Sequence, residues 1–195
     1  MRGFTSHTGK IVVMPGDQVD TDRIIPARFL TRVTRSGYGE LLFADVRGAD
    51  CPLDQPEAQG ATFMVVGSNF GCGSSREHAV WAIMQAGFRA VIAKVTAESS
   101  GYSDIFRQNS ANCGLLLIEL PEAEHEKVAA LGSGAEIHVD LPSQTIQSAA
   151  GEVKFEIKPA TKQAVLEGLD LIGATEKHMP EIEAYETRSS SYIPR

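Results

Sequence analysis

The segment GSNFGCGSSREH, residues 67–78, carries most of the side chains in this sequence that could do chemistry. Its three glycines suggest a loop that cradles a ligand, but three known loop motifs do not fit. A dinucleotide-binding fingerprint requires glycine where Arg76 stands, and a P-loop requires a lysine that the segment lacks. A nucleophile elbow requires glycine where Glu77 stands. The segment therefore belongs to none of these three classes of site.

The spacing of residues within this segment favours anion binding. Gly71 and Gly73 let the backbone approach a ligand closely. Ser74 and Glu77 have the spacing of a capping box, which predicts a helix that begins at Ser74. The free amides of a helix N-terminus, together with the helix dipole, attract anions. We therefore expect a negatively charged ligand at this turn.

Arg76 and the two serines before it could bind and deprotonate a carboxylate substrate. A cation in the first helical turn is unfavourable for the helix, so Arg76 needs another role, and bidentate pairing with a carboxylate is a good candidate. Ser74 or Ser75 could act as a base only as an alkoxide stabilised by backbone amides and Arg76. The alternative is that Ser74 is only a helix cap and Arg76 only a surface ion-pair partner.

Two charged segments nearer the N-terminus could complete such a site. Asp20 and Asp22, in the sequence DTDRIIP, could orient an arginine or bind a cation, or could simply form an Asx turn after the first strand. A basic loop follows, which is either part of an anion site or a solvated face. Its positive charges are Arg28, Arg32 and Arg35.

These segments must be positioned by a mixed α/β domain with more than one β layer. Apolar runs on either side of an amphipathic segment predict a parallel βαβ unit with a right-handed crossover. The predicted strands are 10–14, 62–66, 89–93, 115–120, 136–141, 145–147 and 153–157, of which the last three are antiparallel. The predicted helices are 75–86, 122–131 and two pieces of 159–186 divided near Gly173; 31–60 and 94–114 are predicted loops with one short helix each, and 187–195 a flexible tail.

Composition excludes several functional classes. The chain has 195 residues, 43% hydrophobic and 22% charged, which is typical of a globular protein, and its net charge of −7 disfavours nucleic-acid binding. No apolar run approaches the ~20 residues that a membrane helix needs, and no signal peptide is evident. The cysteines, Cys51, Cys72 and Cys113, are widely spaced, which predicts reduced thiols in the cytoplasm and no metal site in this chain.

Together these segments resemble the aconitase superfamily, and within it the small subunits of bacterial 3-isopropylmalate dehydratases. The resemblance is carried by DTDRIIPARFL at 20–30, GYGELLFADVR at 37–47, GSNFGCGSSREHAVWAI at 67–83 and FEIKPATKQAVLEGLDLIGATEKH at 155–178. One departure is visible, because the segment 94–103 is a few residues longer than the family pattern suggests.

The resemblance implies a three-layer swivelling β/β/α domain, like aconitase domain 4, over residues 1–186. It also implies a heteromer with a large subunit that holds a [4Fe–4S] cluster, whose iron acts as a Lewis acid on the departing hydroxyl group. The substrate would be a small dicarboxylate, and the partners would include neither nucleic acid nor membrane.

The resemblance also implies roles for individual residues. In this family the serine that matches Ser74 is the catalytic base, and the arginine that matches Arg76 holds a substrate carboxylate. Ser75 adjoins them at the substrate, and the acid that matches Asp22 supports the arginines of the site. The remaining expectations are a second substrate arginine (Arg32 or Arg35), supporting glycines (Gly71 and Gly73) and a loop that sets substrate preference (Phe29 and Leu30).

The function that the resemblance implies is a hydro-lyase of leucine biosynthesis, which interconverts 2-isopropylmalate and 3-isopropylmalate through 2-isopropylmaleate. One alternative is the same chemistry on homoaconitate, methylmalate or dimethylmaleate. Another is an anion-binding module without catalytic activity.

Overall fold

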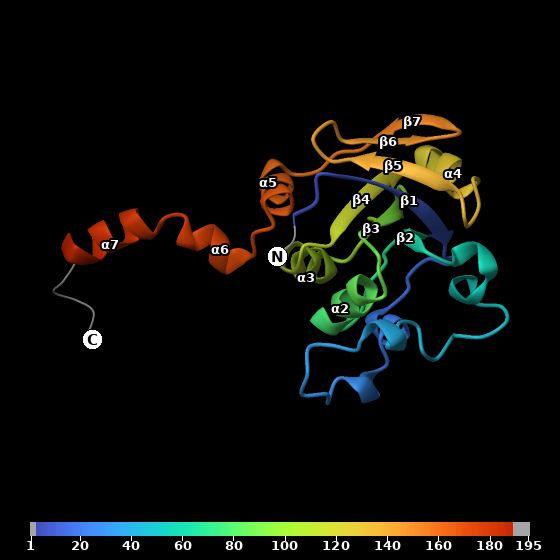
Figure 1. Ribbon diagram of the computed structural model, residues 1–195, viewed down its shortest axis with the longest axis horizontal. Helices are drawn as coiled ribbons and strands as arrows, with labels where there is room; N and C mark the ends of the chain where they lie inside the picture. The colour runs from blue at the N-terminus through green and yellow to red at the C-terminus, as the bar shows by residue number, and fades with distance from the viewer. Residues whose placement is uncertain (1–2, 189–195) are drawn as a thin grey trace.

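The computed structural model describes residues 3–188, which form seven strands, seven α-helices and several short 3-10 helices (Figure 1). The strands are β1 Ser6–Val13, β2 Ala61–Val66, β3 Ala90–Val95, β4 Leu116–Pro121, β5 Glu136–Asp140, β6 Thr145–Ser148 and β7 Gly151–Lys154. The helices are α1 Thr21–Ile24, α2 Glu77–Gln85, α3 Asp104–Cys113, α4 Glu122–Ala129, α5 Pro159–Glu167, α6 Leu171–Glu176 and α7 Met179–Arg188.

These seven strands form one sheet in the order β4-β3-β2-β1-β5-β6-β7. The first four strands are parallel, with Phe63 opposite Ala90 and Ala90 opposite Leu116. β5 pairs antiparallel with β1, and β6 and β7 continue the antiparallel part. The predicted parallel βαβ unit is confirmed as β2, α2 and β3, and the predicted antiparallel strands near the C-terminus are confirmed as β5, β6 and β7.

The sheet curls so that its antiparallel part covers one face of its parallel part (Figure 1). Apolar side chains from both parts meet in one buried cluster, while α2 and α3 pack on the opposite face. The cluster between the two β layers includes Ile11, Phe63, Ile92 and Ile118 from the parallel strands and Val139, Ile146 and Val153 from the antiparallel strands. The predicted three-layer β/β/α architecture is therefore confirmed, and one continuous sheet supplies both β layers.

Three connections leave the carboxyl ends of neighbouring parallel strands. They follow β1, β2 and β3, and they comprise residues 14–20, 67–76 and 96–103. Because β1, β2 and β3 are parallel neighbours, these connections emerge at the same edge of the sheet, which is where open α/β folds place their sites.

The start of α2 differs from the prediction. The capping box is wrong: α2 begins at Glu77, and its N-cap residue is Arg76, whose side chain makes no capping hydrogen bond. The backbone of Arg76 is extended, with φ −134° and ψ 100°. Instead, the carbonyl of Ser74 accepts a hydrogen bond from Thr21 Oγ1 at 2.9 Å. Ser74 is therefore held by Thr21, the first residue of α1, and not by α2.

Two further predictions need correction. Residues 31–60 contain three 3-10 helices, Gly39–Leu41, Pro52–Asp54 and Pro56–Ala58, and not one short helix. The C-terminal segment forms three helices, because Gly168 ends α5 in a left-handed conformation and α6 runs through Gly173. The predicted tail began at residue 187, but α7 extends through Arg188; residues 189–195 lie outside the described residues.

The last two helices, α6 and α7, extend away from the body of the molecule (Figure 1). Among residues 3–188, no helix is long and apolar enough to cross a membrane.

Candidate active site

The glycine-rich turn that precedes α2 is fixed on one side by the connection that follows β1. Gly71 N donates to Val19 O at 2.8 Å, and Thr21 N donates to Cys72 O at 3.0 Å. The side chain of Thr21 adds its bond to the carbonyl of Ser74. The two segments that the sequence singled out, DTD and GCGSSR, therefore lie side by side.

The other side of the turn is fixed by the connection that follows β3. Asn69 N donates to Ser100 O at 2.8 Å and Phe70 N to Gly101 O at 2.9 Å. Ser103 Oγ then donates to Gly71 O at 2.6 Å. The segment 94–103, which is predicted to be longer than the family pattern, thus supports the turn.

Gly71 and Gly73 adopt conformations that other residues rarely reach, with φ +73° and +84°. At Gly71 packing also requires glycine, because a Cβ there would lie 2.3 Å from the ring of Phe106. Gly73 has more room, since its nearest neighbour would be Asp20 Cβ at 3.5 Å. These glycines let the turn fold tightly against α3 before it reaches the serines.

Ser74 and Ser75 are exposed at the tip of this turn, just before the N-terminus of α2. The peptide groups at that end of the helix present N–H donors and the positive end of the helix dipole. A carboxylate at this tip would thus meet hydroxyl groups and a favourable electrostatic field.

Arg76 differs from the serines because its side chain is only 13% exposed. Its guanidinium forms an ion pair with the carboxylate of Asp22, which is 52% exposed. The atom of Arg76 that faces this carboxylate is Nη1, which is buried. Asp22 therefore holds one edge of the guanidinium, and a guanidinium has further N–H donors with which it can bind a carboxylate.

The two acids of the DTD segment have different tasks. Asp20 caps α1, because its carboxylate accepts a hydrogen bond from Arg23 N at 2.8 Å. Asp20 therefore bonds locally to the backbone, as in the Asx turn that the sequence analysis gave as one alternative for these acids. Asp22 instead reaches across to Arg76.

The three arginines of the basic loop have separate environments. Arg28 is paired with Asp45, and Arg32 Nη1 donates to Gly37 O at 3.1 Å in its own loop. Arg35 lies over the ring of Trp81 on α2, with its guanidinium carbon 5.2 Å from the ring centroid. Arg35 therefore contacts α2, the helix that follows Arg76.

Phe29 and Leu30 are half-buried and pack against the core between the sheet and its helices. The guanidinium of Arg28 covers the ring of Phe29 at 4.5 Å. Their predicted part in substrate preference stays a prediction. Val33, fully exposed in the same loop, is the apolar side chain there that reaches furthest into solvent.

Two thiols near the site are protonated at neutral pH. Burial, with a contribution from nearby Asp20, raises the pKa of Cys72. Burial, followed by the hydrogen bond to Glu77, raises the pKa of Cys113 to about 12. Neither thiol is thus activated as a nucleophile. Within residues 3–188 no three His, Cys, Asp or Glu side chains gather as metal ligands.

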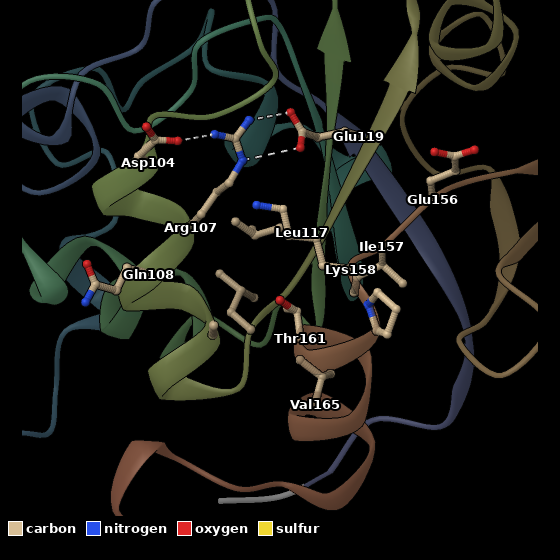
Figure 2. A pocket seen from close by; sticks show the side chains of 13 residues that line it. Asp104, Arg107, Gln108, Leu117, Glu119, Glu156, Ile157, Lys158, Thr161 and Val165 are labelled. Atoms are coloured by element: carbon tan, nitrogen blue, oxygen red, sulfur yellow. Dashed lines mark hydrogen bonds and ion pairs between the residues drawn. The ribbon is translucent and has the colours of Figure 1, made fainter. Parts of the chain in front are cut away.

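A cavity of about 700 Å³ lies elsewhere, between α3, β4 and α5 (Figure 2). Arg107 lines it and is paired with Glu119 and Asp104. None of the predicted site residues lines this cavity. The candidate site is instead an open surface at the edge of the sheet.

Sequence reasoning missed several residues that hold the site together. Thr21 stood between the two acids already singled out, and its hydroxyl could have been considered. Ser103 is the N-cap of α3, and the pattern Ser-Asp before a helix could have predicted that cap. Trp81 and Gln85, which contact the basic loop, gave no local signal, because their partners lie about fifty residues away.

Comparison with known proteins agrees with the family that the sequence resembles. The model of the aconitase C-terminal domain family matches residues 1–123. A relative from Listeria monocytogenes (strain HCC23), named 3-isopropylmalate dehydratase small subunit, is 42% identical over 98% of this chain and 100% of its own length. A relative of the same name from Solibacter usitatus is 44% identical over 94% of this chain and 93% of its own.

A solved structure extends the agreement to the fold. The 3-isopropylmalate dehydratase LeuD from Methanocaldococcus jannaschii aligns with a TM-score of 0.68 and 29% identity, over 92% of this chain and 99% of that one. With the family model covering the site and the relatives covering nearly the whole chain, this protein belongs to the aconitase C-terminal domain family, among the small subunits of 3-isopropylmalate dehydratase.

Proposed function

We propose that this chain is the small subunit of a hydro-lyase that interconverts 2-isopropylmalate and 3-isopropylmalate through 2-isopropylmaleate. The observation that carries the proposal is the position of exposed Ser74 two residues before the mostly buried Arg76, whose guanidinium is paired with Asp22. The names of the relatives support the choice of substrate.

Ser74 takes the proton from the carbon beside a substrate carboxylate and returns it at the neighbouring position. That abstraction builds negative charge on the carboxylate, so cationic and N–H donors must lie close to it. Arg76 supplies a forked pair of donors for the carboxylate, and Ser75 a hydroxyl group at the same tip. Gly71 and Gly73 shape the turn, and Asp22 keeps Arg76 in place.

The reaction also requires a partner. We infer a large subunit that carries the [4Fe–4S] cluster, because the relatives of this chain are named small subunits of the dehydratase. The open site would then be closed by that subunit, with the dicarboxylate between the two chains. Because the proposed role is biosynthetic, we place the protein in the cytoplasm.

The test is reconstitution. The purified chain is mixed anaerobically with a cluster-loaded large subunit, and conversion of 2-isopropylmalate is followed together with that of homoaconitate, methylmalate and dimethylmaleate. Turnover that needs both chains and is fastest on isopropylmalate is the expected result. Faster turnover of another dicarboxylate would change the substrate that we assign to the enzyme. A complex with an intact cluster that turns over none of these compounds would contradict the proposal.

A further inference from the structure

We propose that Gln85 and Trp81 on α2 are positioning residues that fix Arg35 as the second substrate-binding arginine. The inference rests on the proposed function, because it takes Arg35 to bind a substrate carboxylate. It adds the means by which an arginine on an exposed loop is held ready for that contact.

The amide of Gln85 binds the loop backbone at two points. Its Nε2 donates to Arg35 O at 2.8 Å, and its Oε1 accepts from Tyr38 N at 2.9 Å. One carbonyl and one N–H group thus determine the orientation of the amide, and one side chain fixes both ends of the segment 35–38. Residues 31–37 are otherwise exposed, so this clamp acts where the loop has little packing.

The end of the loop is also packed closely on α2. A Cβ at Gly39 would lie 2.6 Å from the carbonyl of Gln85, so only glycine allows this approach. Tyr38 is fully buried, and its ring meets those of His78 and Trp81 at centroid distances of 5.4 and 5.7 Å. The loop therefore has a fixed anchor at Tyr38, one residue after the last exposed position.

The side chain of Arg35 is directed by Trp81. Its backbone is held at Gln85, whereas its guanidinium lies over Trp81, one helical turn nearer the N-terminus of α2. The side chain thus runs along the helix toward the end that Arg76 caps. Trp81 itself is fixed by a hydrogen bond from its Nε1 to Glu77 Oε1 at 3.3 Å.

This arrangement favours Arg35 over the other arginines of the loop. The guanidinium of Arg28 forms an ion pair with Asp45, and that of Arg32 donates a hydrogen bond to the carbonyl of Gly37 in the same loop. Within residues 3–188 the guanidinium of Arg35 contacts an aromatic face and makes no ion pair. A stacked guanidinium keeps its edge donors free for a carboxylate.

The test uses the reconstituted enzyme with Gln85→Ala, Gln85→Glu and, as a matched control on an exposed helix face, Gln108→Ala. Loss of the clamp should raise KM for isopropylmalate about tenfold, since two hydrogen bonds are lost, with little change in kcat. Gln85→Glu keeps the acceptor for Tyr38 N, but its carboxylate repels Arg35 O. It should therefore raise KM as Gln85→Ala does. Trp81→Phe keeps an aromatic face for Arg35, so its KM should stay close to the wild-type value. Trp81→Leu removes that face and should raise KM.

A second readout does not depend on activity. Limited trypsin digestion after Arg35 should be several-fold faster in Gln85→Ala than in the wild type or Gln108→Ala. Unchanged digestion and unchanged KM would overturn the clamp. Faster digestion with unchanged KM would support the clamp and contradict the role of Arg35 in substrate binding, which belongs to the proposed function.

Discussion

At the scale of single residues, Arg76 is the group whose chemistry can be tested most sharply. Arg76→Lys keeps the positive charge but loses the fork that matches a carboxylate. We expect kcat/KM of the reconstituted enzyme to fall about 30-fold, through a higher KM and a lower kcat. Arg89→Lys, just before β3 and away from the turn, is the control. Near wild-type kinetics for Arg76→Lys would contradict the carboxylate role.

Cys113 gives a prediction on pH dependence. Burial raises the pKa of this thiol to about 12, so the folded state prefers the protonated form. The stability that this group contributes is complete below the pKa of an unfolded cysteine, roughly 8.5, and is lost as pH rises toward the folded value. We therefore expect the wild type to lose stability relative to Cys113→Ser between these two pH values.

The measurement is urea unfolding of the wild type and Cys113→Ser at several pH values from neutral to strongly alkaline. Serine keeps a hydroxyl donor for Glu77 and does not ionise in this range. Two stability curves that stay parallel throughout would contradict the assignment.

At the scale of elements, the turn before α2 depends on Gly71. Gly71→Ala combines a positive φ with a Cβ that meets the ring of Phe106. Gly87→Ala is the matched control, because its φ is also positive, +102°, but nothing lies within 4 Å of the added atom. We expect a loss of about 1 kcal/mol at Gly87 from backbone strain and a clearly larger loss at Gly71. Equal losses in urea unfolding would show that Phe106 does not constrain the turn.

The sequence predicted the elements of the core well because their apolar runs are local signals. The strand Ala61–Val66, the parallel crossover through α2 and the antiparallel strands near the C-terminus were all found in this way. The segments DTD and GCGSSR were also recognised from the sequence.

The start of α2 was predicted wrongly for a physical reason. The capping-box rule considers only hydrogen bonds within the segment. The carbonyl of Ser74 instead accepts a hydrogen bond from the hydroxyl of Thr21, fifty-three residues away. The attachment of the basic loop to Gln85 is equally non-local and could not be predicted from spacing. The continuity of the two β layers in one sheet depends on strand pairing across the chain, which local patterns do not determine.

At the scale of the whole molecule, the C-terminal helices α6 and α7 contribute little to the stability of the body. Ile172 and Tyr185 are 70% and 61% exposed, and α7 has no buried residue. A stop after Leu169 should therefore leave the thermal midpoint within about 3 °C of the full chain by calorimetry. A large decrease would contradict this account.

The control for this truncation is a stop after Lys158, which also removes α5. Val165 on α5 is 3% exposed, and its carbonyl accepts a hydrogen bond from Phe4 N at 3.0 Å. Its loss opens the core between the β layers, so this shorter chain should be strongly destabilised.

The most direct test of the central claim is Ser74→Ala in the enzyme reconstituted with its large subunit, with complex formation checked and Ser148→Ala in the β6 hairpin as control. Ser74 is exposed and its side chain is not packed, so assembly should be unchanged. If Ser74 is the base, kcat should fall about 1,000-fold while Ser148→Ala keeps full activity. An assembled Ser74→Ala enzyme with wild-type turnover would remove Ser74 from the reaction.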